Sequence, residues 1–236
     1  MIPVQFNGIN IYPFKDCNQV IDYVEQHPSI LVALNAGKLD RSTPQIKQMI
    51  NNNIGYCDGV GAVLAAKKKG ATCDIIPGCE LWLKIIERCY KTKTFYLVGG
   101  KQEVIDCVVK KLKKDYEGIN IVSYRNGYIK TDQERMDLLM DIEAKRPNVV
   151  FVAMGSPKQE LLMMEMQKIN PSSIYQGLGG SFDVYSGKIK RSPKIFHKLR
   201  LEGLYRAFSR FSDSKIRYRF FNDAMFILRL ELGMIK

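Results

Sequence analysis

The sequence is poor in the side chains that most often bind zinc or carry out serine hydrolysis. It has two histidines, and its six cysteines include no CxxC pair, so a dense set of zinc ligands is missing. There is no GxSxG motif, which together with the low histidine count argues against a Ser-His-Asp hydrolase. We therefore expect neither a metal site nor a catalytic triad.

Two nucleotide-binding motifs and two kinds of membrane segment are also missing. The chain has no GxxxxGK[ST] sequence, and Gly177-Leu178-Gly179-Gly180 lacks the GxGxxG spacing of a dinucleotide-binding fingerprint. No apolar run approaches the roughly 20 residues that span a bilayer. The segment that begins at Met1 lacks the basic and apolar regions of a signal peptide, so we expect a cytoplasmic protein with reduced thiols.

The positive charge is concentrated at the C-terminal end. Hydrophobic residues make up 46% and charged residues 25% of the chain, as in an ordinary globular protein. Residues 187–236 hold thirteen of the 36 Lys and Arg but four of the 24 acidic residues, and so carry +9 of the total net charge of +12. A basic end of this kind favours an anionic partner, which can be a nucleic acid, a phosphorylated metabolite or an acidic membrane.

Short apolar segments alternate with longer amphipathic ones. The expected strands are Ile30–Leu34, Thr94–Val98, Ile119–Tyr124, Val149–Met154 and Ser173–Leu178. The expected helices are Asp16–Gln26, Thr43–Asn52, Val60–Lys69, Glu80–Tyr90, Gln102–Lys114, Asp132–Arg146 and Lys158–Ile169. This alternation predicts an α/β fold, with a Rossmann-like, mostly parallel sheet and helices on both faces. We expect this domain to span residues 1–190 and a basic helical appendage to span residues 191–236.

Glycine-rich turns follow three of the expected strands. They are Gly99-Gly100, Gly155-Ser156-Pro157 and Gly179-Gly180. Because the carboxyl ends of parallel strands meet at one edge of a sheet, these turns predict a crevice in which backbone N–H groups and helix N-termini bind a phosphate. The alternative is that the glycines only make tight turns between strands and helices.

The C-terminal segment combines aromatic and basic residues at helical spacing. Phe196, Phe208 and Phe226 are among its apolar positions, and Lys and Arg are interleaved with them. Basic amphipathic helices of this composition suit an anionic membrane surface. The alternative is that their apolar faces pack on the body of the protein. Nucleic-acid binding would need a recognisable module, and none is present in the sequence.

A series of motifs runs in a fixed order from about residue 30 to about residue 210. They are Leu34-Asn35, Tyr56-Cys57-Asp58-Gly59-Val60-Gly61, Ile76-Pro77-Gly78, Phe95-Tyr96-Leu97-Val98-Gly99-Gly100, Asn126-Gly127-Tyr128, Gly155-Ser156-Pro157-Lys158-Gln159-Glu160, Gly177 to Asp183, Gly187 with Arg191-Ser192-Pro193, and Leu201 to Arg206. Together they resemble the WecG/TagA/CpsF glycosyltransferases of bacterial cell-surface polymer synthesis.

The resemblance implies an inverting transfer of a sugar, of the N-acetylmannosamine type or a related hexose, from a UDP-sugar to a polyprenyl-diphosphate-linked acceptor sugar. It also implies a Rossmann-like fold, chemistry without a metal or other cofactor, and self-association into a homo-oligomer. The appendage is expected to dock on the inner face of the cell membrane, which makes the protein peripheral. No nucleic-acid partner is expected.

The resemblance also assigns roles to residues. Asp58 falls on the aspartate of the family's DG-[VI]-G motif and is our candidate for the general base that an in-line displacement needs. The alternative is that Asp58 caps the helix that follows it. The expected donor-binding residues are Asn35, Gly59, Gly99, Gly100, Gly155, Lys158, Gln159, Gly179 and Gly180. The expected acceptor and membrane contacts are Arg191, Arg206, Arg210, Arg217 and Arg219. Glu160 can be simply an acid in the first turn of a helix.

This chain departs from the family pattern at three positions. Ala33 stands where the family commonly has Thr, Ile75 where it has Arg, and Gly203 where it has Trp. The first two departures affect which donor sugar is expected. The missing Arg argues against a donor that carries an extra carboxylate. Two further functions stay open: a non-catalytic protein of the same fold that binds nucleotide sugars or polyanions, and a soluble transferase whose appendage only packs on the body.

Overall fold

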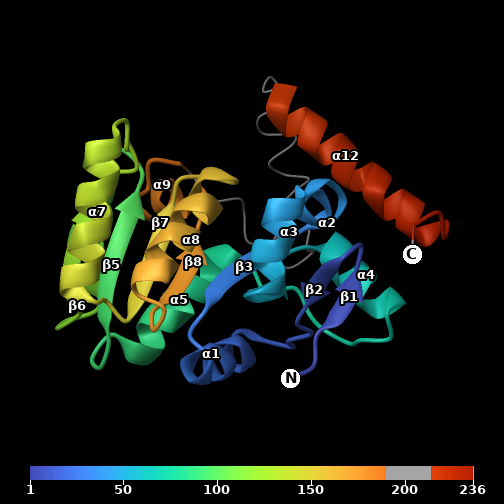
Figure 1. Cartoon of the computed structure of the whole chain (residues 1–236), viewed down its shortest axis with the longest axis horizontal. Coiled ribbons are helices and arrows are strands. Elements are labelled where there is room, and N and C mark those ends of the chain that lie inside the picture. Colours follow the sequence, from blue (N-terminus) through green and yellow to red (C-terminus); the bar gives the residue numbers. More distant parts are fainter. Residues whose placement is uncertain (190–213, 236) are drawn as a thin grey trace.

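A six-stranded parallel sheet forms the centre of the protein (Figure 1). The structure is a computed structural model, and it describes residues 1–189 and 214–235. Every neighbouring pair of strands in the sheet is parallel, so all carboxyl ends meet at one edge. The strands lie in the order β4 (Ile54–Cys57), β3 (Ile30–Leu34), β8 (Ile174–Gly177), β7 (Val149–Ala153), β5 (Thr94–Gly99) and β6 (Asn120–Arg125).

Helices cover both faces of this sheet, each with its own apolar cluster. Figure 1 shows α3, α7 and α8 on one side of the sheet and α5 on the other. The first cluster is built on α2 (Ala36–Arg41), α3 (Pro44–Asn51), α4 (Val60–Lys68), α7 (Asp132–Lys145) and α8 (Lys158–Ile169). The second is built on α1 (Cys17–Gln26), α5 (Gly78–Cys89), α6 (Gln102–Asp115) and α9 (Ser181–Tyr185). The predicted Rossmann-like α/β fold is thereby confirmed.

Side-chain caps explain where several of these helices begin. Asp16, Asn35, Thr43 and Thr131 each accept a hydrogen bond from a backbone N–H in the first turn of the next helix. Thr131 also forms a capping box, because the Glu134 side chain accepts from the N–H of Thr131 in return. Such caps satisfy N–H groups that have no partner inside the helix. The predicted helix starts therefore agree with the structure to within about two residues.

Three strands of the structure were not predicted. Strand β4 is short and contains Gly55, and its apolar stretch was assigned to no element. A small antiparallel hairpin, β1 (Val4–Phe6) and β2 (Ile9–Ile11), precedes the sheet. Asn7 and Gly8 form its two-residue loop with φ of 49° and 74°, which is the backbone that an Asn-Gly hairpin turn requires. The Tyr12 N–H then donates to Gly55 O at 2.8 Å, so the hairpin is joined to the β4 edge.

The C-terminal helix α12 (Ser214–Glu231) packs on the body of the protein. Phe226 and Leu230 are buried in the first cluster, and the Phe226 ring lies edge-on to Phe6 with 6.0 Å between centroids. The Lys68 ammonium donates to the carbonyls of Leu230 at 2.8 Å and Ile235 at 2.9 Å. A C-terminal helix is therefore present, whereas the predicted boundary at residues 190 and 191 and the apolar residues of 195–211 lie outside the described residues.

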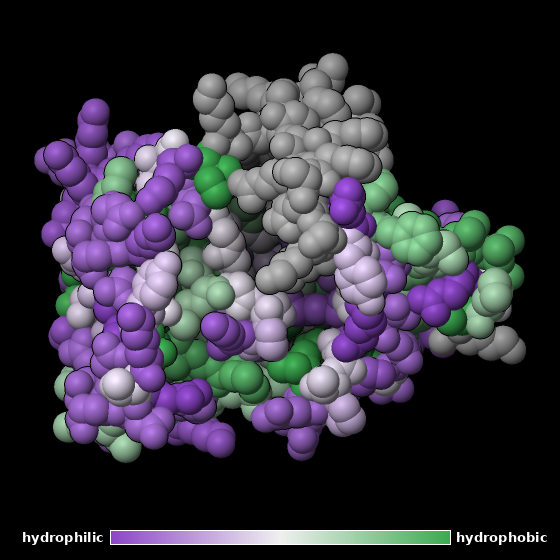
Figure 2. All heavy atoms as spheres, turned by 90° about the horizontal axis from the view of Figure 1, so that it is seen from above, coloured by the Kyte–Doolittle hydropathy of each residue, from purple (hydrophilic) through white to green (hydrophobic). Residues whose placement is uncertain are grey.

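Helix α12 also exposes large apolar side chains to solvent. They are Tyr218, Phe220, Phe221, Met225 and Leu228, and the exposed Leu232 follows the helix. Arg217 and Glu231 of α12 are exposed as well. Figure 2 shows hydrophobic surface at the end of the molecule that carries the C-terminal half of α12. Within the described part of the chain, no helix combines the length and the apolar character needed to cross a bilayer.

We predict that Phe226→Ala releases α12 from the body. Large-to-small changes at buried aromatic positions cost about 3–5 kcal/mol, and the edge-on contact between the Phe226 and Phe6 rings would be lost. Hydrogen exchange should show loss of protection in residues 214–231 with little change in the sheet. Phe221→Ala is the matched control, because Phe221 is 64% exposed on the same helix. Equal protection in both variants would contradict the observed packing.

Candidate active site

The carboxyl edge of the sheet gathers the residues that the sequence assigns to the donor and to catalysis. Asn35 follows β3, Asp58 and Gly59 follow β4, Gly99 ends β5, and Gly155 and Gly179 come soon after β7 and β8. Of the donor residues, Asn35, Lys158 and Gly180 are exposed, and Asp58 is half-buried. Ligands of open parallel sheets bind at this edge, so the structure brings the predicted residues to the expected place.

Asp58 is held at both its backbone and its side chain. Its N–H donates to Leu34 O at 2.8 Å, which fixes it to the end of β3. Its Oδ1 accepts from the N–H of Gly78 at 2.7 Å, and Gly78 is the first residue of α5. A carboxylate at a helix N-terminus is stabilised by the helix dipole. The alternative role as cap of α4 is not observed, because α4 is capped by Gly59 without a side-chain hydrogen bond.

Tyr56 leaves no room for a side chain at position 78. A Cβ atom on Gly78 would lie 2.8 Å from the Tyr56 hydroxyl. Tyr56 is fully buried; burial, and secondarily the nearby Asp58 charge, raise its pKa well above the usual value. The phenol therefore stays neutral and keeps its hydrogen beside the Asp58 carboxylate. Gly78 is thus needed for the contact that orients Asp58.

Gly99, the last residue of β5, and Gly100 allow close contact between chain segments. A Cβ on Gly99, which has φ of 142°, would collide with Ala153 O on β7. The Gly100 N–H donates to Ala153 O at 3.1 Å, and the Gly100 carbonyl accepts from the Gly127 N–H at 2.9 Å. Gly99 and Gly100 therefore form a tight turn at this strand end. A role of Gly99 and Gly100 toward a donor stays a prediction.

Gln159 joins two of the loops. It is 5% exposed, and its Oε1 accepts from the Gly155 N–H at 3.2 Å and the Gly179 N–H at 2.9 Å. Both amides are therefore engaged within the protein. Gly180 differs, since it is exposed and nothing lies within 4 Å of where its Cβ would be. Gln159 positions the loops, and its predicted contact with the donor remains untested.

A buried ion pair lies beside these loops. Lys38 Nζ is 3.1 Å from Glu160 Oε1 and donates to Ala33 O at 3.1 Å. The side chain of Glu160 is 2% exposed and that of Lys38 is 14% exposed. Glu160 is therefore more than a first-turn acid, because it joins α8 to the end of β3 through Lys38. No sequence pattern indicates this pair, because its members are far apart in the chain. Lys158, by contrast, is exposed at the start of α8.

A cavity of about 400 Å³ opens beside β6 rather than over Asp58. Tyr96, Arg125, Asn126 and Asp141 are among its lining residues. The Tyr96 hydroxyl donates to Asp141 Oδ2 at 2.7 Å, and burial with this bond raises the pKa of Tyr96. Asn126 connects the cavity to the carboxyl edge, since it follows directly after β6.

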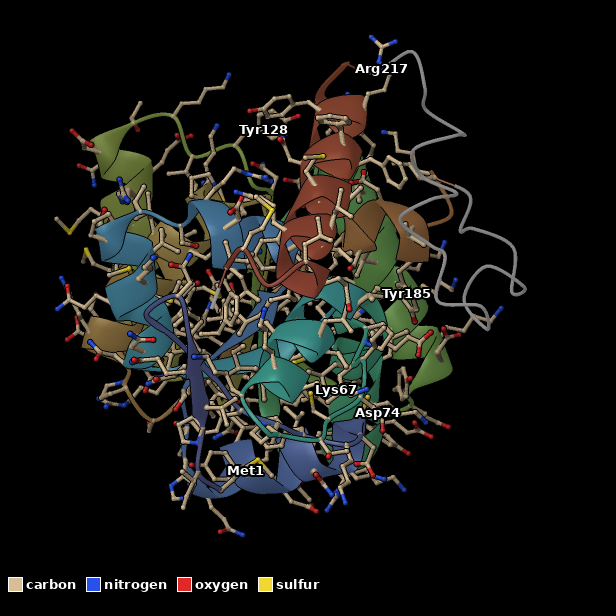
Figure 3. The ribbon with its side chains drawn as sticks, turned by 90° about the vertical axis from the view of Figure 1, so that its right-hand side faces the viewer. Met1, Lys67, Asp74, Tyr128, Tyr185 and Arg217 are labelled. Carbon is tan, nitrogen blue, oxygen red and sulfur yellow. The ribbon has the colours of Figure 1, made fainter. Side chains whose placement is uncertain are left out.

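The basic residues predicted for the acceptor and the membrane are only partly described. Arg217 is exposed near the start of α12, and its side chain projects away from the body in Figure 3. Arg219 lies in α12, but its side chain is outside the described residues. Arg191, Arg206 and Arg210 also lie outside the described residues. Their roles remain predictions.

The parallel sheet flanked by helices defines a Rossmann-like protein, and the held carboxylate and exposed polar residues form a candidate ligand site at the ends of its strands. The model of the WecG/TagA/CpsF glycosyl transferase family matches residues 4–234. The chain belongs to this family. It is a glycosyltransferase of polysaccharide synthesis, and it uses a nucleotide-sugar donor and a sugar acceptor.

We predict that breaking the Lys38–Glu160 pair destabilises the fold. Lys38→Met or Glu160→Gln would leave one buried charge without its partner, at a cost of about 3 kcal/mol. Urea denaturation should also show that the double variant loses less than the sum of the two single changes. Lys84→Met serves as the control, because the Lys84–Glu87 pair is more than half exposed on both sides and such pairs contribute under about 1 kcal/mol. Equal losses at Lys38 and Lys84 would contradict the buried pair.

Proposed function

We propose that this chain transfers a sugar of the N-acetylmannosamine type, or a related hexose, from UDP to a hydroxyl of a polyprenyl-diphosphate-linked saccharide. The transfer inverts the anomeric carbon and needs no metal. The observation that carries the proposal is the Asp58 carboxylate, held by the Gly78 N–H at the carboxyl edge of the sheet, in a chain that matches the family over residues 4–234.

Asp58 acts as the general base in this proposal. Inversion is a single in-line displacement, in which the acceptor oxygen bonds to the anomeric carbon while the bond from that carbon to the diphosphate oxygen breaks. Asp58 takes the proton of the acceptor hydroxyl, and UDP leaves with the bonding electron pair. A base in this role has to be fixed in direction, and the hydrogen bond from Gly78 supplies that constraint.

The donor lies along the strand ends in this proposal. Asn35 holds donor hydroxyls, the exposed Lys158 neutralises the diphosphate, and the open backbone at Gly180 lets phosphate oxygens approach. Gly59, Gly99, Gly100, Gly155 and Gly179 shape the floor on which the donor rests, together with Gln159. The Ala33 side chain lies 3.8 Å from where a Cβ of Gly78 would be. The hydroxyl that a Thr would carry at position 33 would therefore lie close to Asp58. Its absence affects which donor sugar the site prefers.

The acceptor reaches the site at the inner face of the cell membrane. The exposed apolar side chains of α12 support this step, since a soluble helix rarely presents so many large apolar side chains to water. Arg217 and Arg219, with Arg191, Arg206 and Arg210, are proposed to bind the acceptor diphosphate and anionic lipid, each worth about 1 kcal/mol. A homo-oligomer is part of the same proposal, and nucleic acid is not a partner.

Asp58→Asn should reduce transfer to a small residual rate while donor binding is kept. Loss of a general base lowers kcat by about 10²–10⁴, whereas the amide keeps the shape of the side chain. The measurement is turnover with a lipid-diphosphate-linked acceptor, alongside calorimetric binding of the UDP-sugar. Asp16→Asn is the control, because Asn also caps helices well and Asp16 only caps α1. Wild-type turnover in Asp58→Asn would remove the assignment of the base.

The same preparation separates the catalytic proposal from a non-catalytic binding protein. A screen of nucleotide sugars by thermal stabilisation identifies the donor, because ligand binding raises stability by RT ln(1 + [L]/Kd). Salt-sensitive nanomolar binding to RNA, without transfer from any stabilising sugar nucleotide, would favour the polyanion-binding alternative.

Polar changes on the exposed side of α12 should weaken membrane binding. Phe221→Ser with Leu228→Ser removes two apolar side chains that are 64% and 50% exposed, and we expect at least about a tenfold loss of affinity for anionic vesicles. Met136→Ser with Met140→Ser is the matched control, because both side chains are more than half exposed on α7. Equal vesicle binding by the two double variants would argue against α12 as the membrane contact.

A further inference from the structure

Gln176 is a polar side chain in an otherwise apolar part of the core. It is fully buried on the central strand β8, between β3 and β7. Its neighbour Tyr175 belongs to the first apolar cluster, so Gln176 points to the opposite face, where the second cluster lies. Its carboxamide approaches two groups near Asp58: Nε2 is 3.1 Å from Gly78 O and 3.4 Å from the Tyr56 hydroxyl.

These contacts fix the orientation of the Gln176 amide. Gly78 O can only accept a hydrogen bond, so the amide nitrogen must face it. The amide oxygen Oε1 then lies on the other side, where it is buried and has no hydrogen-bond partner among the described residues. A buried polar atom without a partner destabilises a fold. Stability alone therefore does not explain a glutamine at this position.

Gly78 forms one hydrogen bond to each side of the site, donating one and accepting the other. Its N–H donates to Asp58 Oδ1 at 2.7 Å, and its carbonyl accepts from Gln176 Nε2. The Tyr56 hydroxyl occupies the space beside its Cα, where a Cβ would lie only 2.8 Å away. The backbone of Gly78 is thus held between a core side chain and the carboxylate at the edge of the sheet.

We propose that Gln176 is a positioning residue for Asp58, acting through the Gly78 backbone. By holding the Gly78 carbonyl, Gln176 fixes the direction of the Gly78 N–H, and that N–H fixes one oxygen of Asp58. Without Gln176, the first turn of α5 can rotate about Gly78, and the carboxylate loses its set angle toward the acceptor hydroxyl. This inference rests on the proposed function in its catalytic part, whereas the link from Gln176 to Gly78 and Asp58 can be tested without activity.

The amide of Gly78 provides a direct spectroscopic readout. Pro77-Gly78 is the only Pro-Gly pair in the sequence, so labelling proline carbonyl carbons with ¹³C and glycine nitrogens with ¹⁵N leaves a single cross-peak that belongs to Gly78. In Asp58→Asn this peak should move upfield, because the hydrogen bond to a charged oxygen is lost. In Gln176→Met, which keeps a long unbranched side chain but has no amide, the peak should also move upfield.

The matched control is Gln167→Met on α8. Gln167 Nε2 donates to Asn53 Oδ1 at 2.8 Å, so this change also removes a glutamine hydrogen bond, but at the amino end of β4, whereas Asp58 follows its carboxyl end. The Gly78 peak should stay at its wild-type position in this variant. A Gly78 peak that does not move in folded Gln176→Met overturns the inference, whether or not the proposed transfer activity is found.

Kinetics tests the catalytic part of the same inference. We expect Gln176→Met to lower kcat about tenfold, the effect of one neutral hydrogen bond, with the KM for the donor nearly unchanged. In the Asp58→Asn background, Gln176→Met should have no further effect on kcat, because both act through one group. A raised donor KM with unchanged kcat, or additive losses in the double variant, would overturn the positioning role. Absence of transfer in the wild-type protein would instead reject the proposed function and leave the spectroscopic test to decide the link.

Discussion

The contact between Asp58 and Gly78 depends on the lack of room for a side chain at position 78. The Tyr56 hydroxyl lies so close to residue 78, at 2.8 Å from where a Cβ would be, that only a glycine fits there. Because no side chain intervenes, the first N–H of α5 reaches the carboxylate that follows β4. Two segments that come from different βα units are thereby joined at the edge of the sheet. The placement of the whole candidate site follows from this contact and from the parallel direction of the strands.

Backbone N–H groups of the glycine-rich loops form hydrogen bonds within the protein. The N–H groups of Gly100, Gly155 and Gly179 are all bonded within the protein, to Ala153 or to Gln159. A loop whose amides are engaged forms a fixed surface and is not by itself a set of phosphate donors. In the proposed reaction, charge for the donor diphosphate would therefore come from exposed groups at the same edge, of which Lys158 is one.

The sequence predicted what depends on local pattern and missed what depends on contact between distant residues. Apolar segments bounded by Gly, Pro or Asp predicted five of the sheet strands and the starts of seven helices, because caps and periodicity act over a few residues. The short helices α2 and α9 were not predicted. Strand β4 was not predicted because Gly55 interrupts its apolar pattern. The same glycine lets the Leu34 side chain and the Asn10 carbonyl approach the β4 backbone. The Lys38–Glu160 pair and the bond from Gln176 to Gly78 join residues about 100 positions apart. No spacing rule reveals such pairs before the fold is known.

Helix α12 has an apolar side against the body and exposes further apolar side chains to solvent, and its inner side is fixed to α2 and α4. Those two helices begin next to Asn35 and Asp58. The distance from the outer side of α12 to the carboxylate is thus set by rigid helices and not by a flexible tether. In the proposed membrane-bound enzyme, α12 would set a fixed distance between the membrane and Asp58. Only saccharides that extend that length from their lipid anchor could present a hydroxyl to Asp58.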